Sequence, residues 1–158
     1  PVDPFYLAWR AKEFNTSARF IELASELNMA MTEHVGHRLL RALNDDGKAI
    51  RGSRILLLGA AYKRNIDDTR ESPAGRLIEL LKVKGARINY HDPFVAEYHG
   101  HKSTQLTAEA LRECDAVLVV TDHDDVDYAL VGEHAPLVVD TRNVMAALGD
   151  VKARVVRA

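Results

Sequence analysis

Apolar side chains in the first 50 residues recur at the three-to-four-residue spacing of helices. Asp3-Pro4 is a favourable start, because an acidic N-cap precedes proline at the first helical position. Asn15-Thr16 interrupts the pattern, Thr32 is a candidate cap for a further helix, and residues 44–47 end it. The apolar positions after the break are Phe20, Ile21, Leu23, Ala24, Leu27 and Met31. Such broad apolar faces need a partner, either the rest of the chain or a second copy.

From residue 51 onward, short apolar runs alternate with amphipathic stretches. The run at residues 54–58 is apolar almost throughout and is followed by glycine, which is typical of a strand buried on both faces. Further strands are predicted at residues 87–90, 115–120 and 137–139, with an edge strand at 154–156. Helices are predicted at residues 72–84, 107–113 and 125–133. This alternation predicts an α/β fold, a Rossmann-like parallel sheet with helices on both faces.

The two patterns divide the chain into two parts. We expect residues 1–50 to form an all-helical connecting segment that mediates dimerisation, because large exposed apolar patches usually mark interfaces. We expect residues 51–158 to form the α/β domain. The boundary is expected within residues 45–53, where polar residues and glycine separate the two patterns.

Composition places the chain among soluble globular proteins. It is 47% hydrophobic and 28% charged, and its net charge of -2 is unlike the basic balance of nucleic-acid-binding domains. No apolar run approaches the ~18 residues that cross a membrane, and no signal peptide is visible. The single cysteine, Cys114, excludes an internal disulfide and fits a reducing, cytoplasmic compartment. Because the chain does not begin with Met, we expect it to be a fragment or a processed product.

Polar residues follow each predicted strand, and the carboxyl ends of parallel strands share one edge, where ligands bind. Lys63, Arg70 and Arg142 lie on these loops and could converge on a diphosphate, since arginine gives bidentate contacts and lysine a mobile point charge. The helix that starts at Ser72 would add the positive end of its dipole. The alternative is that Arg70 pairs with Asp68 in a structural loop and that Lys63 is solvated.

The first strand-to-helix loop lacks the glycine pattern of a dinucleotide site. Gly59 is followed by Ala60-Ala61 rather than by further glycines. The fingerprint G-x-G-x-x-G places backbone against a pyrophosphate, and that close approach needs the missing glycines. A self-contained NAD-binding domain is therefore disfavoured.

Two long motifs resemble those of one enzyme family. The stretch GAAYKRNIDDTRESPA, residues 59–74, is similar to the motif opening the C-terminal, nucleotide-binding domain of the UDP-glucose/GDP-mannose dehydrogenase family. PVDPFYLAWRAKEF, residues 1–14, resembles the segment just after that family's catalytic cysteine, most of all in the branch acting on UDP-N-acetylhexosamines (GlcNAc or ManNAc). The resemblance covers the whole chain, through VVDTRNV at residues 138–144, and implies a Rossmann-like unit that holds the UDP part of a UDP-sugar.

The same resemblance implies roles for individual residues. Tyr62 and Lys63 match residues that approach the nucleotide sugar, and Arg142 matches a substrate-binding arginine. Arg70 matches a residue that reaches across the interdomain cleft to NAD. Asp3 matches the catalytic aspartate four residues after the cysteine, where it would steer water or relay a proton. Its other interpretation, a plain N-cap, is compatible with that role.

The parent protein implied by the resemblance is an NAD-dependent nucleotide-sugar 6-dehydrogenase. Such an enzyme oxidises the sugar C6 alcohol to a carboxylate in two hydride transfers to two NAD, through a cysteine thioester. This sequence begins two residues after the position of that cysteine and lacks the domain that mainly holds NAD. We therefore expect a fragment that binds the UDP-sugar, forms a homodimer through its N-terminal helices and is inactive alone. The alternative is a non-catalytic nucleotide-binding or protein-interaction module.

No metal site is expected. His99 and His101 have no companions at ligand spacing and are interpreted as residues of a solvated loop. The acidic stretch at residues 121–127 suggests Mg²⁺, but a loop that caps the next helix explains it without a metal. Cys114, at a helix-to-strand turn, is interpreted as a buried and inert thiol.

Overall fold

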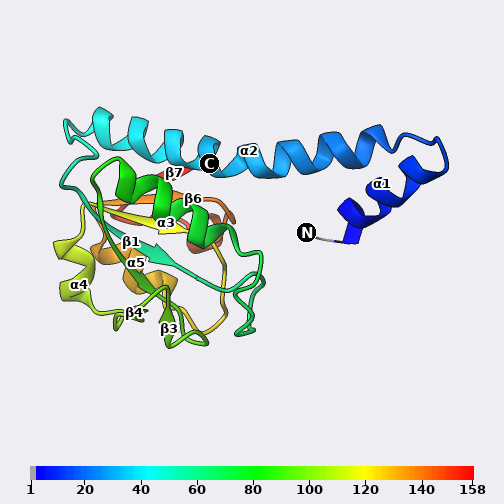
Figure 1. Ribbon diagram of the computed structural model, residues 1–158. Coiled ribbons are helices and arrows are strands. Elements are labelled where there is room, and N and C mark those ends of the chain that lie inside the picture. Colours follow the sequence, from blue (N-terminus) through cyan, green and yellow to red (C-terminus); the bar gives the residue numbers. More distant parts are fainter. Residues whose placement is uncertain (1–2) are drawn as a thin grey trace.

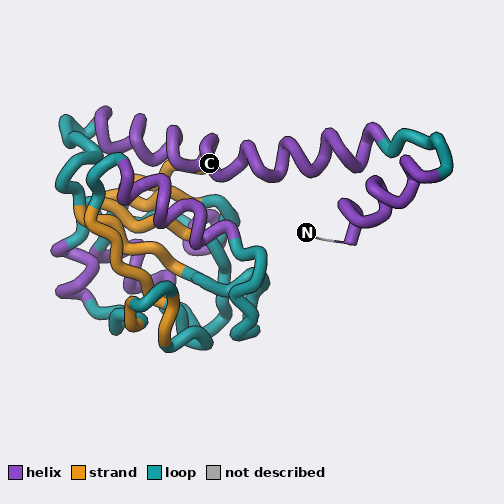
Figure 2. The backbone as a smooth tube through the Cα atoms, in the orientation of Figure 1, coloured by secondary structure: helices purple, strands orange, loops and turns teal. Residues whose placement is uncertain are grey.

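Five parallel strands form the centre of the protein (Figures 1 and 2). The computed structural model describes residues 3–158, and of Asp3 only the backbone. The strands are β1 (Arg54–Leu58), β2 (Arg87–His91), β5 (Ala116–Val119), β6 (Leu137–Asp140) and β7 (Arg154–Arg157). They lie in the order β2-β1-β5-β6-β7, and every neighbouring pair is parallel. The predicted parallel α/β sheet is confirmed; β7 is an edge strand as predicted, and β2 is the other.

Helices cover both faces of this sheet because the central strands are apolar on both. In β1, Ile55 and Leu57 face one core cluster while Leu56 and Leu58 face the other. The first cluster is covered by α2 (Arg19–Asp45) and α3 (Pro73–Val83). The second is covered by α4 (Ala108–Glu113), α5 (Tyr128–His134) and the 3₁₀ turn η1 (Met145–Leu148). Alternate residues of a strand point to opposite faces, so a continuous apolar run fills two cores.

Side-chain caps mark the starts of α3, α4 and α5. Ser72 accepts a hydrogen bond from Ala74 N at 3.2 Å, and proline at the first position of α3 fits the helical backbone. Thr107 caps α4 in the same way. The helix predicted from residue 125 starts only at Tyr128, because the side chain of Asp127 accepts from Leu130 N at 2.9 Å and serves as the cap.

The N-terminal segment consists of α1 (Asp3–Glu13) and the 27-residue α2, about 40 Å long at 1.5 Å per residue. The prediction that Thr32 caps a separate helix is wrong, because α2 runs through it without a break. The C-terminal half of α2 buries Leu39 and Leu43 against the sheet. Its N-terminal half extends beyond the domain, and α1 folds back beneath it (Figure 1).

Two features stabilise the attachment of α2. Gly36 lies against α3, where an added Cβ would come within 2.7 Å of the Cδ2 atom of Leu80, so a larger residue would require that side chain to move. At the far edge, the Nε atom of Arg38 donates to the carbonyl of Arg157 at 3.1 Å, and Arg154 pairs with Asp46 at 2.9 Å. The long helix is therefore tied both to α3 and to β7.

One small element was not predicted. The hairpin of β3 (Glu97–Tyr98) and β4 (His101–Lys102) turns through His99 and Gly100, both with positive φ. The sequence predicts a solvated loop around His99 and His101, and strands of two residues are too short for an alternating pattern to indicate them. Among residues 3–158, none of the helices has the length and apolar character that crossing a membrane requires.

Candidate functional site

A cleft of about 730 Å³ lies between the α/β domain and the N-terminal helices. Three of the residues singled out in the sequence line it: Tyr62, Lys63 and Arg142. Its other lining residues are Phe5, Ser25, Asn28, Met29, Thr32, Glu71, Pro73 and Arg76. The cleft thus combines apolar and hydroxyl side chains from α1 and α2 with cations from the carboxyl edge of the sheet.

Lys63 lies on the loop between β1 and α3 as an exposed cation. Its ammonium nitrogen is 5.6 Å from the centroid of the Tyr62 ring, which is a cation–π distance. No carboxylate pairs with it in the part of the chain that the structure describes. A lysine that is held by an aromatic face but not neutralised by an acid keeps its charge available for an anionic ligand.

Arg142 lines the cleft, and a hydrogen bond from its side chain to the backbone of Val120 orients it there. Its Nε atom donates to the carbonyl of Val120 at 2.7 Å, and the carboxylate of Asp122 lies 4.0 Å from that same atom. No hydrogen bond to its two terminal nitrogens is found within residues 3–158. This arrangement fixes one edge of the guanidinium and leaves the other two N–H-bearing nitrogens for bidentate contacts with an anion.

The turn that carries Arg142 is built by Asp140 and Thr141. Asp140 is buried at the end of β6; its carboxylate accepts from Arg142 N at 2.9 Å and from Met145 N at 3.0 Å. The hydroxyl of Thr141 donates to the carbonyl of Val119 at 2.8 Å. The sequence Asp-Thr-Arg therefore has a local explanation: the first two residues fix the turn and the third faces the cleft.

Arg70 does not join the other two cations. Its side chain is 87% exposed, it does not line the cleft, and it forms a bidentate pair with Asp68 at 2.9 and 2.8 Å. Hydrogen bonds from Arg70 lower the pKa of Asp68 to about 2. The structure thus brings Lys63 and Arg142 to one cleft. It leaves Arg70 on the surface, paired with Asp68, which is the alternative that the sequence left open. Asp3 is the first residue of α1, and its side chain lies outside the described part.

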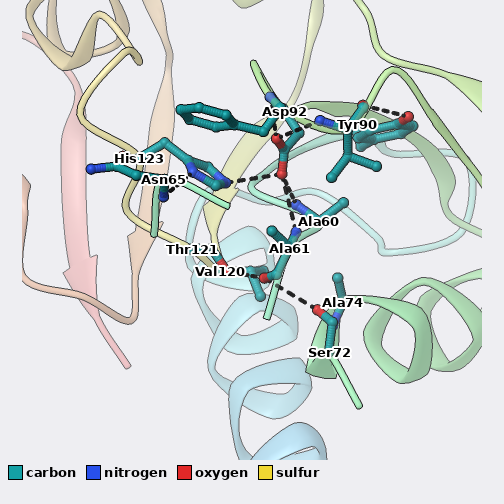
Figure 3. A network of polar contacts seen from close by, with 12 residues as sticks. Ala60, Ala61, Asn65, Ser72, Ala74, Tyr90, Asp92, Val120, Thr121 and His123 are labelled. Atoms are coloured by element: carbon teal, nitrogen blue, oxygen red, sulfur yellow. Dashed lines mark hydrogen bonds and ion pairs between the residues drawn. The ribbon is translucent and has the colours of Figure 1, made fainter. Parts of the chain in front are cut away.

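A buried polar network behind the loop was missed by the sequence analysis (Figure 3). The carboxylate of Asp92 accepts hydrogen bonds from Ala60 N at 2.7 Å and Ala61 N at 3.0 Å. It also accepts from the ring of His123, at 2.9 Å, and both side chains are fully buried. Asp92 and His123 each follow a predicted strand, but nothing in the sequence distinguishes them from solvated residues of the sheet edge.

This network also bears on dinucleotide binding. In a Rossmann domain, backbone N–H groups at the first strand-to-helix turn face the pyrophosphate. Here the N–H groups of Ala60 and Ala61 already bind the carboxylate of Asp92. Gly59 is required for another reason: its φ is +86°, and an added Cβ would lie 2.4 Å from the Thr121 carbonyl oxygen. The residues at this turn do not fit the phosphates of NAD.

Residues 3–158 contain no group of three His, Cys, Asp or Glu side chains placed to hold a metal ion. His101 instead contacts Lys82 at 2.8 Å, and His91 contacts the Thr104 carbonyl at 2.8 Å. Asp124, in the acidic stretch, pairs with Arg64 and Asn65. These side chains are therefore engaged in structural contacts.

Cys114 is buried, and its thiol donates to the carbonyl of Leu111 at 3.1 Å. Burial raises its pKa to about 11, and the nearby Asp115 contributes in the same direction. Because the thiolate is the reactive form, we expect iodoacetamide at pH 7.5 to modify Cys114 at least tenfold more slowly in the folded chain than in urea. Mass spectrometry of timed aliquots measures this, with glutathione in each buffer as the reactivity control. Equal rates in the two states would contradict the assignment of an inert thiol.

The comparisons with known proteins agree on one family. A model described as the UDP-glucose/GDP-mannose dehydrogenase family, UDP binding domain, matches residues 56–147. A UDP-N-acetyl-D-mannosamine dehydrogenase of Methanococcus maripaludis is 32% identical over 91% of this chain and 34% of its own length. A UDP-glucose 6-dehydrogenase of Rhizobium meliloti is 31% identical over 91% of this chain and 35% of its own length.

A solved structure supports the same relationship. The crystal structure of an NDP-N-acetyl-D-galactosaminuronic acid dehydrogenase from Methanosarcina mazei superposes with a TM-score of 0.73 and 28% identity. The match covers 87% of this chain and 30% of that one. This chain therefore spans about a third of the length of the proteins it matches.

Proposed function

Because the chain belongs to the UDP-glucose/GDP-mannose dehydrogenase family and carries its UDP-binding domain, we propose that the cleft binds the UDP part of a UDP-sugar. The observation that carries the proposal is the convergence of Lys63 and Arg142, from loops after β1 and β6, on one cleft. A mobile ammonium and a guanidinium with unpaired nitrogens suit the oxygens of a diphosphate. Tyr62, beside Lys63, is proposed to contact the nucleotide sugar, in agreement with the resemblance of the loop motif.

We propose further that the chain acts as part of an NAD-dependent UDP-sugar 6-dehydrogenase, which oxidises the sugar C6 alcohol to a carboxylate. Two relatives that cover most of the chain are named UDP-N-acetyl-D-mannosamine dehydrogenase and UDP-glucose 6-dehydrogenase. The motif at residues 1–14 favours a UDP-N-acetylhexosamine as the substrate. A single, buried cysteine is consistent with a cytoplasmic enzyme.

We propose that NAD is held mainly by other parts of such an enzyme. The turn after β1 does not fit the NAD phosphates, since Asp92 occupies the N–H groups that would face them. Arg70, exposed on its loop, is proposed to reach NAD from this domain, in which case it would exchange its pairing with Asp68 for a phosphate. Asp3 is proposed to act near the nucleophile, as the resemblance implies.

We propose that two copies of the chain associate through the N-terminal helices. On α2, Phe20, Leu23, Leu27 and Met31 follow one another at three-to-four-residue spacing, and all four are exposed. On α1, Phe5, Tyr6, Leu7 and Trp9 are exposed as well. Apolar surface of this extent is unusual on a monomer, and packing against a second copy would bury it.

The experiment that tests the proposed function is a titration of the 158-residue chain with UDP, followed by an assay of turnover. We expect saturable binding with a dissociation constant on the order of 0.1–1 mM, because two charge-assisted contacts act in an open cleft. We expect no NADH formation above background with NAD and UDP-sugars. Uridine serves as the control ligand and should bind more weakly, since it lacks the diphosphate. If UDP shows no saturable binding at a concentration about tenfold above the upper end of this range, the proposal is contradicted.

A further inference from the structure

The loop that carries Tyr62 and Lys63 is held at both of its ends by buried side chains. At one end, the N–H groups of Ala60 and Ala61 donate to Asp92, at 2.7 and 3.0 Å. At the other end, the N–H group of Asn65 donates to the Nδ1 atom of His123 at 2.9 Å. Between these two points, Tyr62 and Lys63 line the cleft, while Arg64 pairs with Asp124 and does not line it. Asp92 and His123 do not line the cleft either, so they set the position of the loop without touching a ligand there.

The two holding side chains are themselves joined. The Nε2 atom of His123 lies 2.9 Å from the carboxylate of Asp92 (Figure 3). Because the Nδ1 atom accepts a hydrogen bond from Asn65, the ring proton must lie on Nε2, where it is donated to Asp92. The hydrogen bonds form a closed cycle. Asp92 binds the start of the loop, the end of the loop at Asn65 binds His123, and His123 binds Asp92.

The ends of three strands position this cycle of hydrogen bonds. Asp92 follows β2, His123 follows β5, and the loop itself follows β1, which lies between them in the sheet. The other oxygen of Asp92 accepts from Phe94 N at 2.8 Å and Val95 N at 3.0 Å. Its carboxylate therefore has five donors and no rotational freedom.

The cleft-facing part of the loop has few other restraints. Tyr62 N donates to the Asp68 carbonyl at 2.7 Å, and the Lys63 ammonium lies over the Tyr62 ring without a hydrogen bond or ion pair to the described residues. Asn65 has a positive φ of 60°, a conformation that a non-glycine residue keeps only when its surroundings enforce it. Two sets of hydrogen bonds hold it there: the N–H group of Asn65 donates to His123, and the side chain of Asn65 exchanges hydrogen bonds with Asp124, the next residue along the chain from His123.

We propose that His123, through the cycle of hydrogen bonds that it closes with Asp92, is a positioning residue for Tyr62 and Lys63 and thereby sets the affinity of the cleft for a nucleoside diphosphate. The inference rests on the proposed function, because it concerns the same cleft. His123 touches no ligand. Its contribution is to hold Asn65, so that Lys63 lies in the cleft with Arg142 before a diphosphate arrives. Binding then costs little conformational entropy, because the loop is already ordered.

Two substitutions separate the two hydrogen bonds of the His123 side chain, one to Asn65 and one to Asp92. The amide of asparagine superposes on the Nδ1 side of the ring, so His123→Asn keeps an acceptor for Asn65 and loses the donor to Asp92. The amide of glutamine reaches the Nε2 position, so His123→Gln keeps the donor to Asp92 and loses the acceptor for Asn65. We expect His123→Gln to raise the dissociation constant for UDP about tenfold and His123→Asn to change it less than threefold.

Stability should follow the opposite order. His123→Asn loses more buried volume and one contact of the Asp92 network, so its melting temperature should fall further than that of His123→Gln. If UDP affinity instead tracks the melting temperature across the two variants, His123 has a merely structural role and the proposal is overturned. The matched control is His91→Gln, at a half-buried histidine of the same sheet edge whose side chain contacts the Thr104 carbonyl; its hydrogen bond to the turn after β1, from Gly59 N, is made by its backbone and is kept in the variant. It should leave UDP affinity unchanged.

Two measurements do not depend on UDP binding. Hydrogen exchange should show the Asn65 amide protected in the unaltered chain and in His123→Asn, and exchanging at least tenfold faster in His123→Gln. Nitrogen-15 NMR of the unaltered chain should show His123 neutral with its proton on Nε2; a proton on Nδ1 would overturn the proposal even if no variant folds. If the unaltered chain does not bind UDP, the proposed function fails, and hydrogen exchange still decides whether His123 holds the loop.

Discussion

Replacing Lys63 and Arg142 together with alanine is expected to weaken UDP binding at least a hundredfold. A hydrogen bond to a charged group contributes about 1.5–3 kcal/mol, and 1.4 kcal/mol corresponds to a factor of ten in affinity. Each single substitution should therefore cost about tenfold or more. From a starting value on the order of 0.1–1 mM, the double variant should show no saturable signal in a calorimetric titration at fixed salt.

Two further variants show whether charge or geometry matters. Arg142→Lys should recover only part of the affinity, because lysine lacks the planar fork that the Val120 carbonyl orients. Arg70→Ala removes the same charge from an exposed residue outside the cleft, and it should change UDP affinity less than twofold. A loss of UDP binding in Arg70→Ala together with unchanged binding in Arg142→Ala would mean that the two arginines are assigned to the wrong ligands.

The sheet was predictable because its central strands are buried on both faces. Leu56, Leu58, Val117 and Val119 fill one core, and their neighbours in sequence fill the other, so the runs are continuously apolar. The course of α2 was harder to predict. Thr32 has the chemistry of a cap, but the helical spacing continues through it from Leu27 to Val35 and Leu39, and packing of those last two side chains overrides the cap signal.

The site was predictable only where a general rule connects distant residues. Lys63 and Arg142 follow parallel strands, and the carboxyl ends of such strands share one edge, so their convergence follows from the topology. The same rule placed Arg70 there too, but Asp68 two residues earlier offers it a bidentate partner on the loop itself. Pairing with Asp68 therefore determines the position of the Arg70 side chain. The contact with NAD proposed for Arg70 requires this ion pair to break.

The network of Asp92 and His123 had no signal in the sequence. One aspartate and one histidine at two strand ends look like ordinary polar residues of the sheet edge. Their burial depends on the strand order, which places β2 and β5 on either side of β1. The lining of the cleft by Asn28 and Thr32 was equally hidden, since it depends on the angle at which α2 leaves the domain. Tertiary arrangement, and not residue type, gives these residues their place.

Leu27→Glu is expected to weaken self-association of the chain at least a hundredfold. Leu27 is 58% exposed, in line with Leu23 and Met31 on the projecting half of α2. Burying a leucine side chain contributes about 1.5–3 kcal/mol, and a symmetric dimer contains the substitution twice, so the loss is about 3–6 kcal/mol. Glutamate favours helix, so α2 itself should persist. Sedimentation velocity over a range of concentrations measures the dissociation constant.

The matched control is Val83→Glu, which places the same charge on another exposed apolar residue, at the end of α3 and outside the N-terminal helices. It should sediment like the unaltered chain, and circular dichroism should show the same helix content in all three proteins. If Leu27→Glu and Val83→Glu behave alike, the apolar face of α2 is not the contact between copies. If the unaltered chain remains a monomer at high micromolar concentration with α2 fully helical, the exposed leucines do not mediate association between copies at all. The proposed homodimer would then have to be abandoned for this chain.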